Sequence, residues 1–78
     1  MSSEVSVALG LAVKELREKV GLSQEQLGLE TGVHRTYVSL IERGIRHPTV
    51  DILFRLAGGL RVRPHDLVKV AEKNMAAR

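Results

Sequence analysis

Five side chains between positions 35 and 43 combine hydrogen-bond donors, methyl groups and cations at helical spacing. They are Arg35, Thr36, Ser39, Leu40 and Arg43. A helix that only had to be soluble would more often carry glutamate and lysine at such positions. Arginine and hydroxyl groups can hydrogen-bond to base edges and phosphates, and side-chain methyl groups can contact thymine methyl groups. This mixture is therefore typical of a helix face that enters the major groove of DNA.

The opposite side of the same segment is apolar. Val38 and Ile41 lie three residues apart and Val33 comes just before the helix, so all three can be buried. Gly32 supplies a turn position that tolerates a positive φ. The alternative interpretation is a plain helical hairpin with a solvated basic face.

The residues before this turn carry a helix start signal. Ser23 is a candidate N-cap, and Gln26 three residues later can close a capping box. That helix should run to about Thr31, and the next should begin near Arg35 and end at Gly44. Two short helices joined by a glycine-containing turn make a helix-turn-helix, which is predicted over about residues 23–43.

Three more helices are predicted around this unit. The first spans Glu4 to Val20, with Ser3 as its N-cap and Gly21 as its stop. Thr49 should cap a fourth helix that ends near Gly58, and its core-facing stripe is expected at Val50, Leu53, Phe54 and Ala57.

The fifth helix should begin at Arg63-Pro64, with proline at its first position. The fourth and fifth helices together should cover about residues 49–74, and residues 75–78 should fray. The fold class expected is all-α, a compact five-helix domain that includes all 78 residues.

The positive charge is concentrated in one part of the chain. The net charge is only +3, but residues 33–63 contain six arginines against the two acids Glu42 and Asp51. Arginine is well suited to bidentate contact with guanine and phosphate. The charge distribution thus agrees with a nucleic-acid-binding face in the middle of the chain.

Other classes of function find little support in the composition. The histidines His34, His47 and His65 are too scattered for a metal site or a catalytic pair, so neither an enzyme nor a cofactor or small-molecule ligand is expected. There is no cysteine, no apolar run near the ~20 residues of a membrane span and no signal-peptide pattern, so a cytoplasmic location is expected. A chain this short without disulfides or metal commonly gains stability by oligomerisation, which favours a homodimer.

Several motifs together resemble a known family over nearly the whole chain. They are Leu22-Ser23-Gln24-Glu25-Gln26-Leu27, Thr31-Gly32-Val33, Ile41-Glu42-Arg43-Gly44, Pro48-Thr49-Val50-Asp51-Ile52-Leu53 and Leu56-Ala57. The chain resembles the Cro/repressor-like, or XRE-like, helix-turn-helix family, whose fold is lambda-repressor-like. Within it, Arg35-Thr36-Tyr37 followed by Ile41-Glu42-Arg43 and by Arg46 is similar to the controller proteins of restriction–modification systems.

The resemblance implies a dimeric transcription regulator that places its third helix in the major groove of a (pseudo)palindromic operator. With the face chemistry above, the residues expected to contact bases are Arg35, Thr36, Ser39 and Leu40. Those expected at the DNA backbone are Ser23, Gln24, Tyr37, Arg43, Arg46 and His47. Two alternatives stay open: half-buried packing for Tyr37, and packing against Ile45 for Leu40.

Two further assignments are structural. The resemblance implies a salt bridge between Arg17 and Glu42, which joins the first and third helices. Apolar residues left over after the expected core stripe is filled are candidates for a dimer interface, namely Ile52, Leu56, Leu67 and Val68. The alternative function is an antitoxin-type interaction module with autoregulatory DNA binding. Such modules usually carry a longer partner-binding segment than this chain shows.

Overall fold

The computed structural model describes residues 3–77, which form five helices and no strand. The helices are α1 (Glu4–Val20), α2 (Gln24–Thr31), α3 (Arg35–Glu42), α4 (Val50–Gly59) and α5 (Pro64–Ala76). This order agrees with the five helices expected from the sequence. No helix among residues 3–77 is both long and apolar enough to cross a membrane.

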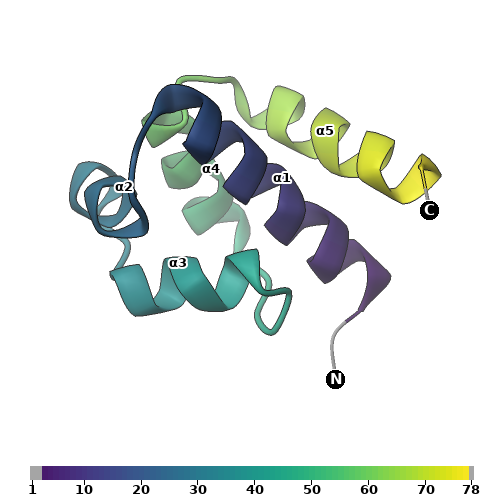
Figure 1. Ribbon diagram of the computed structural model, residues 1–78, viewed down its shortest axis with the longest axis horizontal. Coiled ribbons are helices and arrows are strands. Elements are labelled where there is room, and N and C mark those ends of the chain that lie inside the picture. Colours follow the sequence, from purple (N-terminus) through teal and green to yellow (C-terminus); the bar gives the residue numbers. More distant parts are fainter. Residues whose placement is uncertain (1–2, 78) are drawn as a thin grey trace.

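Helix α1 lies at the centre of the molecule, which measures 31 × 24 × 21 Å along its principal axes. Figure 1 shows α5 along one flank of α1 and α3 on the other, with α2 at the end of α1 where that helix stops. Helix α4 packs against both α2 and α5 and closes the far side. Within residues 3–77, no other helix covers the outward face of α3 (Figure 1).

The helix starts follow the local signals in the sequence. The hydroxyls of Ser3, Ser23 and Thr49 accept backbone hydrogen bonds from the first turns of α1, α2 and α4. The Ser23 amide donates in return to the side chain of Gln26, so the predicted capping box is present. Pro64 opens α5 as predicted.

The turn between α2 and α3 depends on Gly32, which has φ +74°. Its amide and that of Val33 both donate to the carbonyl oxygen of Gly28, at 2.9 and 3.1 Å. A side chain would be strained in this left-handed conformation. The prediction of a positive φ at Gly32 is therefore confirmed.

Helices α1 and α3 approach closely at Gly10. A Cβ atom placed there would overlap the carbonyl oxygen of Ile41 and crowd that of Glu42. The end of α3 therefore rests on the backbone of α1, with no side chain between them. This contact fixes how near α3 lies to the body of the protein.

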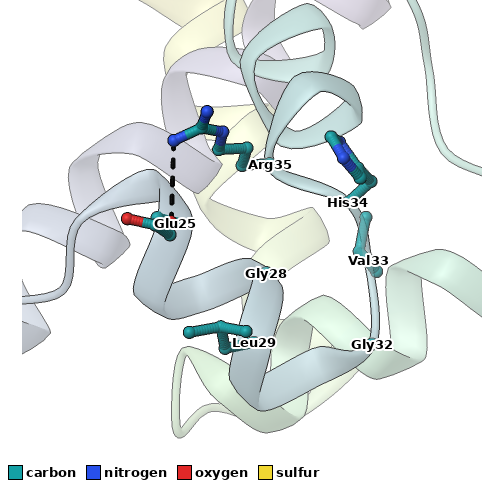
Figure 2. A pocket seen from close by; sticks show the side chains of 7 residues that line it. All are labelled: Glu25, Gly28, Leu29, Gly32, Val33, His34 and Arg35. Atoms are coloured by element: carbon teal, nitrogen blue, oxygen red, sulfur yellow. Dashed lines mark ion pairs between the residues drawn. The ribbon is translucent and has the colours of Figure 1, made fainter.

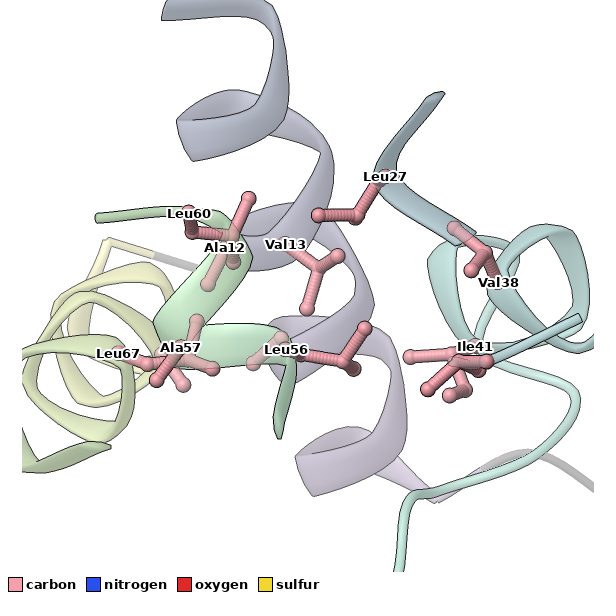
Figure 3. Packing of buried hydrophobic residues seen from close by; sticks show 12 residues of the cluster. Ala12, Val13, Leu27, Val38, Ile41, Leu56, Ala57, Leu60 and Leu67 are labelled. Atoms are coloured by element: carbon pink, nitrogen blue, oxygen red, sulfur yellow. The ribbon is translucent and has the colours of Figure 1, made fainter. Parts of the chain in front are cut away.

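The core is formed by residues of all five helices, together with Val33 before α3 and Leu60 after α4. Figure 3 shows this packing from close by. Its largest fully buried side chains are Val13, Leu27, Val38, Ile41, Leu56, Leu60 and Leu67. Because each of these has lost all its contact with water, each contributes roughly 1.5–3 kcal/mol to folding relative to an exposed position.

The stripe predicted for α4 is wrong in part. Val50 and Phe54 are 71% and 58% exposed, whereas Leu56 and Ala57 are buried. Helix α4 packs against α2 and α5 through the side that carries Leu56 and Ala57. Val50 and Phe54 therefore point away from the core.

The expected fraying at the end of the chain is also corrected. Helix α5 continues to Ala76, and Met75 packs against the core. Arg78 lies outside the described residues.

Candidate nucleic-acid interface

Helix α3 has two chemically different faces, as the sequence predicted. Val38 and Ile41 are fully buried, and Val33 is almost so. On the other face, Arg35, Thr36 and Arg43 are exposed, and Ser39 and Leu40 are half-buried. Hydroxyl, methyl and guanidinium groups thus share one outward surface, which is the chemistry that base edges and phosphates require.

The first turn of α3 carries an ion pair to α2. The Arg35 guanidinium lies 3.6 Å from the Glu25 carboxylate, and both side chains are about two-thirds exposed, at 65% and 64%. Both residues line an open cavity of about 490 Å³, together with His34 and Leu29. Figure 2 shows the ion pair and these neighbours from close by. A pair this exposed is weak, typically 0.2–1 kcal/mol, so Arg35 stays available to a ligand.

The far end of α3 is held by the predicted salt bridge. Arg17 donates through Nε and Nη2 to the two oxygens of Glu42, at 2.7 and 3.0 Å, and through Nη1 to the carbonyl oxygen of Leu22. The side chains are only 12% and 3% exposed. The hydrogen bond to Glu42 raises the pKa of Arg17, and the charges of Glu42 and Glu18 raise it further against the opposing effect of burial. Arg17 therefore stays charged, and the pair connects α1 to α3.

Two of the expected DNA-backbone contacts make hydrogen bonds within the protein. The side-chain amide of Gln24 donates to Oε1 of Glu42 at 3.0 Å, which extends the buried ion pair to the start of α2. Ser23 uses its hydroxyl to cap the same helix. The Ser23 amide donates to Gln26 within the capping box, whereas the Gln24 backbone amide lies at the start of α2, where a helix favours an anion. A phosphate contact at these two residues stays a prediction.

Three other expected backbone contacts come together beside α3. Tyr37, Arg46 and His47 line a second cavity of about 290 Å³ with Ser3, Ser6 and Ile45. The Tyr37 hydroxyl donates to the carbonyl oxygen of His47 at 3.4 Å, while its ring packs against the core. The packing alternative for Tyr37 is thus realised, and a contact of its hydroxyl with the DNA backbone stays a prediction.

The expected dimer interface needs correction. Leu56 and Leu67 are fully buried in the core, so neither can contact a second copy of the chain. Ile52 is half-buried and Val68 is 43% exposed, so these two keep surface for a partner. The exposed apolar residues Val50 and Phe54 were assigned to the core instead.

Sequence reasoning also missed the cap of α3. His34 precedes this helix, and its Nδ1 accepts a hydrogen bond from the Thr36 amide at 3.0 Å. Histidine is not among the preferred N-cap residues, so no local sequence pattern predicts this cap. Among residues 3–77, no three side chains of His, Cys, Asp or Glu gather to hold a metal ion.

Comparisons with known proteins agree with this geometry. Residues 13–67 match the helix-turn-helix family. Control protein C.BamHI of Bacillus amyloliquefaciens is 38% identical over 69 residues, which cover 87% of this chain and 85% of that protein.

Solved structures of similar proteins extend the likeness to the fold. The restriction–modification controller protein C.AhdI from Aeromonas hydrophila is 39% identical, with a TM-score of 0.77 over 80% of this chain and 94% of that one. The controller protein C.Esp1396I, solved as a tetramer in complex with its natural 35 base-pair operator, is 28% identical, with a TM-score of 0.86 over 95% of this chain and 97% of that one. The chain therefore belongs to the XRE-type helix-turn-helix family, which includes the controller proteins of restriction–modification systems.

Proposed function

We propose that this protein is a sequence-specific transcription regulator that binds a (pseudo)palindromic DNA operator as a homodimer. The observation that carries the proposal is the two-faced helix α3, whose apolar side is fully buried and whose polar, cationic side is uncovered. A single helix reads few base pairs, and a two-fold dimer doubles the number by placing two such helices about 34–36 Å apart on one face of DNA.

The relatives support the nature of the partner. C.Esp1396I binds its operator as a tetramer, and C.BamHI and C.AhdI are control proteins. We extend DNA binding, self-association and a role in restriction–modification control to this chain on that likeness. Because the proposed partner is DNA, we also propose that the protein acts inside the cell, and the proposed function requires no catalytic step.

The residues divide between two tasks. Contacts to bases carry sequence information, whereas contacts to phosphates mostly carry affinity and position. We assign base contacts to Arg35, Thr36, Ser39 and Leu40. We assign backbone contacts to Ser23, Gln24, Tyr37, Arg43, Arg46 and His47.

We propose that the partner surface for a second copy lies on α4 and α5. Val50 and Phe54 share one side of α4, at i and i+4, and are well exposed there. Ile52 and Val68 keep part of their surface on the same two helices. Exposed apolar residues that serve no core are candidates for a protein interface.

Two measurements test the function. Selection from a pool of random duplexes should enrich sites with two related half-sites, and sedimentation equilibrium at micromolar concentration should give about twice the monomer mass of 8.6 kDa. The variant Phe54→Asp should shift the mass toward the monomer and leave the helical spectrum unchanged. Selection that enriches no sequence, or an 8.6 kDa species at all concentrations, would reject the proposal.

A further inference from the structure

Helix α3 is capped by a different chemical group from its neighbours. The caps of α1, α2 and α4 are the hydroxyl oxygens of Ser3, Ser23 and Thr49, which accept hydrogen bonds at any pH. The carboxylate of Asp66 serves the start of α5. Within residues 3–77, α3 alone has an imidazole as its cap, because Nδ1 of His34 accepts from the Thr36 amide at 3.0 Å.

An imidazole can do this only while it is neutral. In the neutral ring one nitrogen is an acceptor and the other a donor, so an accepting Nδ1 places the proton on Nε2. Protonation turns both nitrogens into donors and removes the acceptor. It also puts a positive charge at the positive end of the α3 dipole. Both effects disfavour the first turn of α3.

The surroundings leave this ring open to solvent. His34 is exposed, and Figure 2 shows it in the turn beside Val33, where it lines the same cavity as Glu25 of α2 and Arg35 of α3. On the side of α4, the Arg55 guanidinium lies next to Gly32. No carboxylate forms an ion pair with His34 among the described residues. Protons from solvent can therefore reach the ring.

The capped turn is the part of α3 that bears the proposed base contacts. The amide that His34 holds belongs to Thr36, and Arg35 is the first residue of the helix. We propose that His34 is a positioning residue for DNA recognition, and that protonation of its ring makes sequence recognition weaker at acidic pH. This inference rests on the proposed function, because it concerns the discrimination between DNA sequences.

The test compares the wild-type protein with His34→Asn between pH 8 and about pH 5.5, a range in which imidazoles titrate. Asparagine is among the strongest N-cap residues and does not titrate. The measured quantity is the ratio of the Kd for a scrambled duplex to the Kd for the duplex selected above. In the wild type this ratio should fall about fivefold on acidification, the affinity equivalent of one N-cap. In His34→Asn it should stay constant.

Two further histidine variants identify the titrating group. His65→Asn, in α5, should show the same decrease of the Kd ratio as the wild type, since His65 is not among the proposed DNA contacts. If His47→Asn abolished the fall while His34→Asn retained it, the titrating group would be His47, which would overturn the inference. An equal pH profile in the wild type and His34→Asn, including a flat one, would also overturn it.

A readout without DNA separates this inference from the proposed function. In nitrogen–proton NMR spectra, the Thr36 amide resonance of the wild type should shift as the pH falls. The protection factor of this amide, which is its intrinsic exchange rate at a given pH divided by the observed rate, should decrease. In His34→Asn both quantities should stay constant. If the Thr36 amide shows this change but the protein selects no DNA sequence, the titrating cap would be supported and the proposed function would be rejected. A Thr36 amide whose chemical shift and protection factor do not change with pH would refute the cap itself.

Discussion

Two arginine–glutamate pairs hold α3 at opposite ends, and their environments differ sharply. Arg17 and Glu42 meet at 2.7 Å with side chains 12% and 3% exposed, whereas Arg35 and Glu25 meet at 3.6 Å with both side chains about two-thirds exposed. Burial makes the first pair costly to break, because removal of one partner leaves an uncompensated charge. The second pair stays largely exposed to solvent, so its loss should cost little. An arginine–glutamate pair therefore stabilises the fold at one end of α3, whereas at the other end the arginine of such a pair remains accessible to a ligand.

The largest expected effect is on the buried pair. Arg17→Ala should lower the free energy of unfolding by about 3–5 kcal/mol, because the Glu42 carboxylate remains buried without its partner. That is a large part of the stability of a typical small domain. Thermal and denaturant unfolding, followed by circular dichroism, would measure the loss.

A double variant serves as the control for this pair. Arg17→Met combined with Glu42→Leu removes both charges and keeps much of the volume, so it should recover a large share of the lost stability. If Arg17→Ala kept its melting temperature and lost DNA binding, Arg17 would be a direct DNA contact, and the contrast between the two pairs would fail.

The exposed pair should behave in the opposite way. Arg35→Ala should leave the free energy of unfolding within about 0.5 kcal/mol of the wild type, as surface substitutions usually do. It should cost about 1–3 kcal/mol on the selected duplex and relax base preference at one position per half-site. Binding to a panel of single-base variants would measure both effects. A loss of stability with unchanged base preference would show that Arg35 is structural.

Arg43 tests an arginine that joins neither pair. It is exposed just after α3 and forms no ion pair among the described residues. Arg43→Ala should weaken selected and scrambled duplexes alike. It should also flatten the plot of log K against log salt by about one phosphate contact per subunit. A changed base preference would instead place Arg43 at the base edges.

The smallest effect is expected from the partner of Arg35. Glu25→Gln should change the free energy of unfolding by less than about 1 kcal/mol, because exposed pairs contribute little. Loss of a carboxylate beside the proposed DNA-binding face should raise the affinity for all sequences slightly, most visibly at low salt. Paired salt titrations with the wild type would detect it, and a destabilised Glu25→Gln protein would contradict the distinction drawn between the pairs.

Local signals explain what the sequence could predict. The caps at Ser23 and Thr49, the turn at Gly32 and the two faces of α3 each depend on residues within one or two helical turns of one another. Such signals need no knowledge of the rest of the fold, and the structure agrees with them. The Arg17–Glu42 pair spans 25 residues, and only the family resemblance suggested it.

The errors arose where packing, rather than local pattern, decides. Helix α4 has apolar residues on several sides, so periodicity alone did not fix which side faces the core. Val50 and Phe54 were placed inside, and Leu56 was placed at the interface, whereas their true burial is the reverse. The link from Gln24 to Glu42 was missed because it joins residues 18 apart and no local pattern encodes it.

The missing side chain at Gly10 has a consequence for protein engineering. Because α3 rests directly on the backbone of α1 there, this contact fixes the tilt of α3 without involving its exposed face. The outward residues of α3 should therefore be exchangeable with those of another regulator that also has glycine at this point, and the graft should carry its sequence preference with it. In a donor with a bulkier residue at this point, the same side chains of α3 would lie at a different angle to the body of the protein. The graft would then have to include that residue of α1 as well as the outward residues of α3.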